Sequence, residues 1–253
     1  MRNLVEYLNR RRFTVLFSGG KDSTATLLWV IDNIVHRDWN VVFIRVAENT
    51  HSLNEEYVVN LCDSLDILDR LVIASTNRSF FGDLEKWGIP LLGCYRWCYY
   101  HYKQKVVNWL ARKRLVYRVQ VSGVTRTSRA RRNLRHIEYY RLDDAICVLP
   151  VLDWSREEIL DYVKDHGVEL NPCYKLVGHS GNCLFCPYHT KAAIYKTISF
   201  LRTFEPDLYH GLRRALLARR PRGRLGREIL KRWLGALTQG SLRSYAEFET
   251  KPF

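Results

Sequence analysis

The sequence lacks the features that mark membrane and secreted proteins. No apolar run approaches the roughly 18–20 residues that a membrane-spanning helix needs, and the N-terminal segment 1–6 has no apolar stretch like that of a signal peptide. Seven cysteines scattered over 253 residues are too few for a disulfide scaffold. We therefore expect a cytoplasmic globular protein with no membrane partner, whose reduced cysteines are available to bind metal.

Acidic residues are scarce in two segments, which makes the whole chain basic. The formal net charge is +14. Residues 103–141 hold twelve Lys and Arg against the single acid Glu138, and residues 211–253 hold eleven against three glutamates. Such blocks either contact a polyanion or form a solvated basic surface. We interpret them as candidate nucleic-acid contacts on a mildly acidic body.

Short apolar runs alternate with segments of helical periodicity through the first part of the chain. The alternation predicts an α/β fold with a doubly wound, mostly parallel five-stranded sheet. Residues 172–188 form a constrained loop, and the chain beyond them has a helical pattern. We predict an α/β domain over residues 1–188 and a basic helical extension over residues 189–253. Strands are expected at 13–17, 41–46, 71–74, 117–122 and 145–149, and helices at 23–36, 54–68, 97–113 and 155–166.

A glycine-containing loop follows the first predicted strand. Residues 18–23 are Ser-Gly-Gly-Lys-Asp-Ser, placed between a strand and a helix where backbone N–H groups and the helix dipole favour an anion. The adjacent glycines let the backbone approach a ligand closely, and the two serines can donate hydroxyl hydrogen bonds. The spacing differs from the Walker pattern. We predict that this loop binds phosphate.

Four of the cysteines form two close pairs, Cys94 with Cys98 and Cys183 with Cys186. Two pairs brought together by a fold can make a four-sulfur site, which suits zinc or an iron–sulfur cluster. Spacing alone leaves both open, together with cysteines that bind nothing. Cys173 belongs to neither pair. Three roles stay open for it: a reactive thiol, a substitute metal ligand, or a residue that stands in for an apolar one.

These motifs resemble those of a known family. The Ser-Gly-Gly-Lys-Asp-Ser loop is similar to the PP-loop of ATP pyrophosphatases, which split ATP between its α and β phosphates. Arg96-Trp97-Cys98 with Lys103, the segment 148–155 and the segment 171–187 resemble, in the same order, motifs of the phosphoadenosine phosphosulfate (PAPS) reductase family in its broad sense. Two segments depart from that family's pattern. Residues 47–50 stand where it usually has Asp-Thr, and the segment from Gly123 lacks its glutamate.

The resemblance implies an adenine nucleotide alpha hydrolase-like fold and an ATP-binding enzyme. It implies ATP and Mg²⁺ as cofactors and favours a 4Fe-4S cluster over zinc at Cys94, Cys98, Cys183 and Cys186. It assigns nucleotide binding to Ser18, Gly19, Gly20, Lys21, Asp22, Ser23, Gly123 and Arg126, and catalytic roles to Lys21, Asp22 and Cys173.

Three activities fit these motifs: ATP-dependent sulfur transfer that forms AMP and releases pyrophosphate, reduction of a sulfonucleotide (APS or PAPS) to sulfite, and nucleotide binding without catalysis. The reductases resembled here use a nucleophilic cysteine in a C-terminal segment, whereas no cysteine follows Cys186. We therefore favour the sulfurtransferase. Its expected partners are a nucleic acid, with tRNA favoured over DNA, and a sulfur donor such as sulfide or a persulfide carrier. DNA phosphorothioation and a homodimer stay open.

Overall fold

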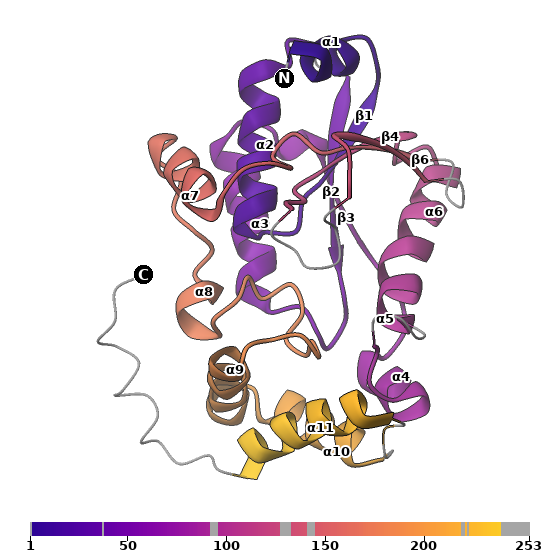
Figure 1. The fold of residues 1–253 in the computed structure, drawn as a ribbon, viewed down its shortest axis with the longest axis vertical. Helices are drawn as coiled ribbons and strands as arrows, with labels where there is room; N and C mark the ends of the chain where they lie inside the picture. The colour runs from indigo at the N-terminus through magenta and orange to yellow at the C-terminus, as the bar shows by residue number, and fades with distance from the viewer. Residues whose placement is uncertain are drawn as a thin grey trace.

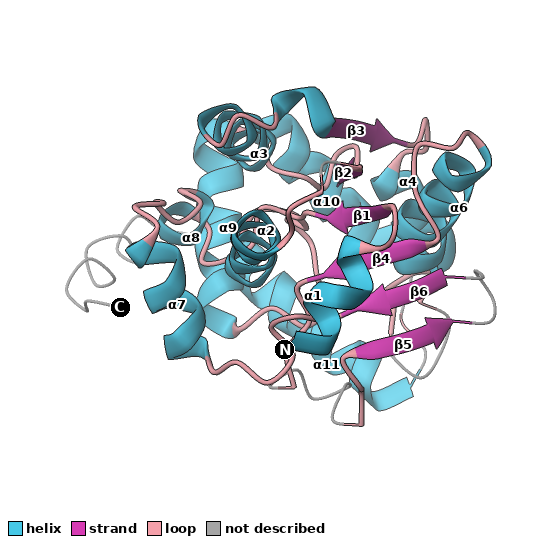
Figure 2. Ribbon diagram, turned by 90° about the horizontal axis from the view of Figure 1, so that it is seen from above, coloured by secondary structure: helices cyan, strands magenta, loops and turns pink. Residues whose placement is uncertain are grey.

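A six-stranded sheet forms the centre of the computed structural model, which describes residues 2–36, 38–91, 96–126, 133–140, 145–218, 221 and 223–238. The strand order is β3-β2-β1-β4-β6-β5 (Figure 2). Neighbouring strands are parallel except β5, which runs antiparallel to β6 at one edge. The strands are β1 (Phe13–Leu16), β2 (Trp39–Arg45), β3 (Leu71–Ser75), β4 (Val119–Ser122), β5 (Ile137–Tyr140) and β6 (Ala145–Val148).

The predicted α/β class with a mostly parallel sheet is confirmed, and β5 is an addition to the five predicted strands. The inner strands β1, β2 and β6 are mostly apolar because both of their faces are covered. In β5, by contrast, Ile137 and Tyr139 are partly exposed. Such an edge strand carries only a weak apolar pattern, and this one lies within a basic segment, so it escaped prediction.

Helices cover both faces of the sheet, as a doubly wound fold requires. They are α1 (Arg2–Asn9), α2 (Lys21–Asn33), α3 (Ser52–Ser64), α6 (Lys105–Arg112) and α7 (Arg156–Asp165). One face packs against α1, α2 and α3, with Val41 and Phe43 buried beneath them. The other packs against α6, whose Val106 and Leu110 meet the intervening residues of β2. Figure 1 shows α2 and α6 on opposite sides of the sheet.

A layer of helices lies beyond the end of the sheet, at the bottom of Figure 1. It shares one apolar core with the sheet domain, since Phe80, Trp97 and Phe185 belong to the same buried cluster as Trp233. Among the described residues, no helix is both long and apolar enough to cross a membrane. The remaining elements are η1 (Leu68–Arg70), α4 (Phe80–Trp87), α5 (Trp97–Tyr99), the π-helical turn η2 (Tyr100–Gln104), α8 (Cys173–Leu176), α9 (Lys191–Phe204), α10 (Pro206–Ala218) and α11 (Gly223–Thr238).

Candidate functional site

The predicted phosphate loop connects β1 to α2, as the sequence indicated. Gly19 has φ +73°, and a Cβ on it would overlap the Asn54 side chain, so both the backbone conformation and the available space require glycine. Within the loop, the Ser18 and Ser23 hydroxyl oxygens lie 3.0 Å apart, and Ser23 donates to the Gly20 carbonyl at 2.8 Å. The loop is therefore a tight turn at the N-terminus of α2, where an anion is favoured.

Two buried asparagines hold the carbonyl groups of the loop. Asn54 donates to the Ser18 carbonyl at 3.3 Å, and Asn171 donates to the Gly19 carbonyl at 3.0 Å. The two side chains also pair with each other, Asn171 Nδ2 donating to Asn54 Oδ1 at 2.6 Å. Both residues are almost fully buried. Because these contacts bind the carbonyl oxygens, they leave the anion-binding role to the N–H groups of the turn.

The start of α2 is held from two further directions. The backbone N–H of Lys21 donates to the Tyr174 hydroxyl at 3.0 Å, while the Lys21 ammonium pairs with the adjacent Asp22 carboxylate. On the other side a Cβ at Gly123 would overlap the backbone of Asp22 and Ser23. Glycine thus lets the end of β4 pack directly against the phosphate loop.

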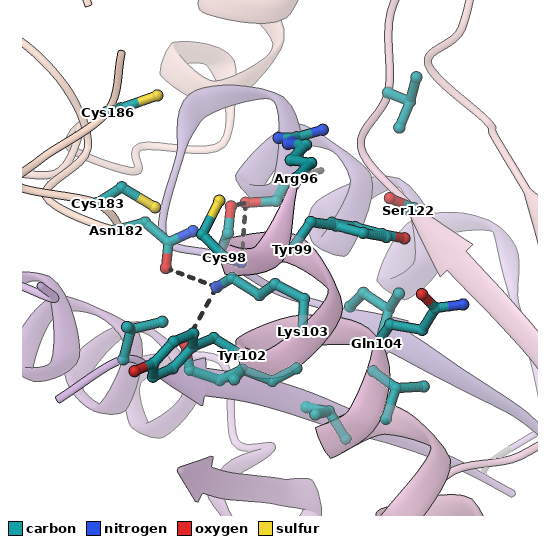
Figure 3. Close-up of a pocket in the computed structure, with 18 of the residues that line it drawn as sticks. Arg96, Cys98, Tyr99, Tyr102, Lys103, Gln104, Ser122, Asn182, Cys183 and Cys186 are labelled. Carbon is teal, nitrogen blue, oxygen red and sulfur yellow. Dashed lines mark hydrogen bonds between the residues drawn. The ribbon is translucent and has the colours of Figure 1, made fainter. Parts of the chain in front are cut away.

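Three of the predicted metal ligands lie together at a second part of the site. Cys98 comes from α5, and Cys183 and Cys186 from the loop between α8 and α9; Figure 3 shows their sulfur atoms on the same side of a cavity. Burial raises the pKa of Cys186 to about 12, and the nearby Cys183 adds to the effect. Burial also raises the pKa of Cys98, and Cys183 again contributes. The fourth predicted ligand, Cys94, lies outside the described residues.

Lys103, from the π-helical turn η2, lies beside these thiols. Its ammonium donates to Asn182 Oδ1 and to the Ile44 carbonyl, both at 3.3 Å (Figure 3). Burial lowers the pKa of Lys103, whereas Cys183 and Cys98 act to raise it. The amine is therefore fixed between the end of β2 and the cysteine loop, next to the sulfur atoms.

One cavity of about 630 Å³ joins the phosphate loop to the thiols. This volume is within the usual range for a small-molecule site. Gly19, Gly20, Lys21 and Asp22 support the loop from outside the cavity wall. The residues of the predicted site that line the cavity are Ser18, Ser23, Gly123, Cys98, Cys183 and Cys186.

The turn after β2 positions the cysteine loop, a role that sequence analysis missed. Asn49 is buried and accepts a hydrogen bond from the Phe185 N–H at 2.7 Å, while its carbonyl accepts one from Leu184 at 2.7 Å. Thr50 donates to the Asn182 carbonyl at 3.4 Å. Asn49 and Thr50 belong to the segment 47–50, which stands where the resembled family usually has Asp-Thr. A polar side chain at the carboxyl end of a parallel strand was the available signal, since ligand sites gather there.

Besides the four loop residues 19–22, two more predicted site residues do not line the cavity. Cys173 is fully buried against Gly181, and burial raises its pKa to about 12. Arg126 pairs with the Asp153 carboxylate and donates to the Leu134 carbonyl at 2.6 Å. The catalytic role of Cys173 and the nucleotide-binding role of Arg126 stay predictions, without a place at the cavity wall to support them.

The donor chemistry at the thiols fits a sulfur-ligated group. Cys98, Cys183 and Cys186 are soft ligands of the kind that hold zinc or iron–sulfur clusters. In the described part of the chain, no group of three or more His, Cys, Asp or Glu side chains is arranged to hold a metal ion. The three thiols are therefore candidate ligands that would have to draw together around the group they hold.

Comparisons with solved structures return similar folds at low sequence identity. The PAPS reductase of Candida auris, in a phosphate complex, is 14% identical; the match covers 70% of this chain and 92% of that one, with a TM-score of 0.49. The U34-tRNA thiolase of Methanococcus maripaludis, with its 4Fe-4S cluster, is 13% identical, with 80% and 69% coverage and a TM-score of 0.42. Yeast FAD synthetase in complex with FAD is 14% identical, with 79% and 67% coverage and a TM-score of 0.44.

The sequence itself matches one curated relative and one family. An uncharacterized protein of Methanocaldococcus jannaschii is 28% identical over 201 residues, which are 77% of this chain and 45% of that protein. The chain thus spans less than half the length of this relative. Residues 12–197 match the phosphoadenosine phosphosulfate reductase domain, including the phosphate loop and both predicted cysteine pairs. The resemblance predicted from the motifs is confirmed: the chain belongs to the phosphoadenosine phosphosulfate reductase domain family.

Proposed function

We propose that this protein is an ATP-dependent sulfurtransferase that adenylates a nucleic-acid target, with a tRNA base favoured, and replaces the activated oxygen by sulfur. The observation that carries the proposal is the shared cavity. Ser18 and Ser23 of the phosphate loop line the same space as Cys98, Cys183 and Cys186. A nucleotide held at the loop and a sulfur held near the thiols would therefore meet without leaving the site.

The first step activates the target oxygen. The N-terminus of α2 and those N–H groups of residues 18–23 that are not already bonded within the protein hold the phosphates of ATP. The Lys21 ammonium, behind the cavity wall, adds positive charge at the end of the loop that holds the departing pyrophosphate. A carbonyl oxygen of the base attacks the α-phosphorus, the bond to the β-phosphate oxygen breaks, and pyrophosphate leaves. Mg²⁺, when bound, neutralises phosphate charge. Asp22 orients Lys21 through their ion pair.

The second step exchanges oxygen for sulfur. Sulfide attacks the activated carbon of the base, the carbon–oxygen bond breaks, and AMP leaves with the oxygen and the electron pair. With sulfide as donor no oxidation or reduction is required. A 4Fe-4S cluster at Cys98, Cys183 and Cys186 would supply an iron to bind the sulfide once Cys94, the predicted fourth ligand, leaves that iron. Zinc is the alternative. Lys103 holds a positive charge beside the incoming anion.

The test separates the two steps with two variants of the full chain. Ser23→Ala should lower pyrophosphate release from ATP at least tenfold, because it removes a hydroxyl from the loop, while exposed Ser64→Ala on α3 serves as its matched control. Cys183→Ser should keep pyrophosphate release yet abolish sulfur insertion. Nucleoside mass spectrometry of tRNA and DNA, from cells with and without the gene, identifies the product.

Other outcomes would replace the proposal. Sulfite formation from a sulfonucleotide, with every thiolated nucleoside unchanged, would assign the chain to the reductases. Loss of sulfur from the DNA backbone alone would assign it to DNA phosphorothioation. Unaltered pyrophosphate release in Ser23→Ala would refute the role of the phosphate loop.

A further inference from the structure

Helix α6 carries a basic face that the proposed chemistry does not use. Between Arg96 and Ser122 the sequence has no Asp or Glu. Lys105, Trp109, Arg112 and Lys113 are all exposed. Trp109 is four residues after Lys105, and the adjacent pair Arg112 and Lys113 is three to four residues after Trp109, which places all four along one side of the helix. We call these four residues the α6 stripe.

The cations of the α6 stripe have no acidic partners nearby. Among the described residues, no carboxylate forms an ion pair with Lys105, Arg112 or Lys113. Trp109 lies between them with 51% of its surface exposed. The cations alone fit a solvated basic surface, and the exposed ring of Trp109 adds a flat face on which a base can stack.

The α6 stripe borders the cavity. Gln104, Val107 and Asn108 of the same helical segment line the cavity wall, each one or two residues from a member of the stripe. Tyr99, one turn earlier, lines the wall as well, with the Arg96 guanidinium over its ring at 5.3 Å from the centroid. In Figure 3 Tyr99 and Gln104 both project from this segment at the cavity. A polymer bound along the stripe would thus reach the rim of the cavity.

We infer that the α6 stripe binds an unpaired segment of the polynucleotide whose base enters the cavity. Lys105, Arg112 and Lys113 contact successive phosphates, and a base next to the target stacks on Trp109. Cations beside an exposed aromatic ring are the pattern by which proteins hold single strands. The identity of the base in the cavity rests on the proposed function, whereas the contact to the strand does not.

An unpaired strand fits this surface better than a duplex does. Stacking on Trp109 needs a base with a free face, and in a duplex both faces are covered by neighbouring base pairs. A cavity of about 630 Å³ likewise admits a base that has left its stack, not an intact base pair with its backbones. The stripe would therefore select loops and single strands.

The test measures binding by fluorescence anisotropy with the full chain and no ATP. The probes are a fluorescein-labelled 20-nucleotide RNA without secondary structure, the same sequence as single-stranded DNA, and the RNA duplex. We expect the single strands to bind more tightly than the duplex, and a comparison of RNA with DNA shows which sugar the surface prefers. Equal or tighter binding of the duplex, or no binding of any probe, would overturn the inference.

Two variants assign the binding to the stripe. Trp109→Ala should weaken single-strand binding roughly 5- to 100-fold with little change in salt dependence, and Trp109→Phe should retain most of the affinity. Arg112→Gln/Lys113→Gln should reduce the salt slope by about 1.4, since each phosphate contact on a single strand contributes about 0.7. The control, Arg10→Gln/Lys164→Gln, removes two exposed cations, one directly after α1 and one on α7, away from α6 (Figure 1).

The outcomes separate this inference from the proposed function. If Trp109→Ala binds RNA as the wild type does, or if the control variant loses as much affinity as Arg112→Gln/Lys113→Gln, the stripe is not the binding surface. If the stripe variants lose RNA affinity while the wild type releases no pyrophosphate from ATP, the binding surface stands and the proposed reaction fails. Circular dichroism and thermal melting establish that each variant is folded.

Discussion

The two halves of the cavity are built in different ways. The phosphate loop is held by side chains that come from distant parts of the chain and bind its backbone, namely Asn54, Asn171 and Tyr174. The cysteine loop is held by the turn after β2, through Asn49. It also packs on an apolar core that reaches to Trp233, whose ring lies 4.8 Å from that of Phe185.

The two kinds of support imply different behaviour when a ligand binds to each half of the cavity. At the phosphate loop the carbonyl groups are occupied and the turn is fixed, so an anion can bind with little rearrangement. At the thiols the backbone is fixed, yet the described side chains are not gathered as a metal site. Under the proposed function, the first half is organised before its nucleotide arrives, whereas the second half would need its bound group to complete it. The predictions below test this contrast.

The largest effect is expected for Asn171→Ala, which removes the main support of the phosphate loop. Asn171 donates to Gly19 and Asn54 and accepts from the Cys173 N–H at 2.9 Å, all in a buried site. We expect the free energy of unfolding to fall by about 3 kcal/mol, because buried polar groups lose their partners. ATP affinity should fall as well, since the turn loosens. Urea unfolding and calorimetric titration with a non-hydrolysable ATP analogue measure the two effects.

Asn60→Ala is the matched control for this variant, since Asn60 is exposed on α3, the same helix that carries Asn54. It should change stability by no more than about 0.5 kcal/mol. A loss in Asn171→Ala no greater than in Asn60→Ala would show that the loop holds its shape without Asn171, and the contrast between the two halves would disappear.

The parts of the fold that could be predicted are those with local patterns. The parallel strands and the helix after the phosphate loop follow from apolar runs and periodicity. The eight-residue helix α4 was missed because so short a segment carries little periodic signal. Strand β5 was missed because half of its residues face solvent at an edge.

Within the site, local motifs again separate what was predicted from what was not. The hexapeptide that begins at Ser18 and the two cysteine pairs each place several functional side chains close together in the sequence. The sequence alone therefore indicated both parts of the site. Asn54 is a single asparagine within a predicted helix, and its function depends on Asn171, 117 positions away. Asn49 likewise depends on Phe185, 136 positions away. The sequence can indicate a polar side chain after a strand, as at Asn49, but contacts of this length leave no trace in local pattern, so only the folded chain reveals the partner.

A smaller effect is expected at the cysteine loop for Asn49→Ala. The change leaves the buried Phe185 N–H without its acceptor, so the free energy of unfolding should fall by about 2 kcal/mol. Because Asn49 contacts the cysteine loop and not the phosphate loop, iron or zinc content after anaerobic purification should fall while affinity for the ATP analogue stays within about twofold. Metal analysis and calorimetry measure the two quantities.

Asn60→Ala again gives the baseline for this variant. Loss of nucleotide affinity in Asn49→Ala, at unchanged metal content, would mean that the turn after β2 serves the phosphate loop instead. The two halves would then not be separately supported.

The smallest effect is expected for Tyr174→Phe, which removes only the hydroxyl that accepts from the Lys21 N–H. Stability should fall by about 1 kcal/mol. Affinity for the ATP analogue should not fall, because the released N–H lies at the N-terminus of α2 and can donate to a phosphate. A concurrent loss of affinity as large as in Asn171→Ala would show that Tyr174 shapes the loop and does not merely occupy one of its donors.

The pH dependence gives this last variant a second readout. Burial raises the pKa of Tyr174 to about 12 from an ordinary value of 10.0, so the folded state favours the protonated phenol. The contribution of this group to stability is fully present below about pH 10 and is lost as the pH rises towards 12, because the unfolded chain deprotonates first. The stability difference between the wild type and Tyr174→Phe should therefore narrow above pH 10. A difference that stays constant from pH 7 to pH 11 in urea unfolding would mean that burial in the fold does not hold the phenol protonated, and the Tyr174 hydroxyl would then not be enclosed beside Lys21 as the structure has it.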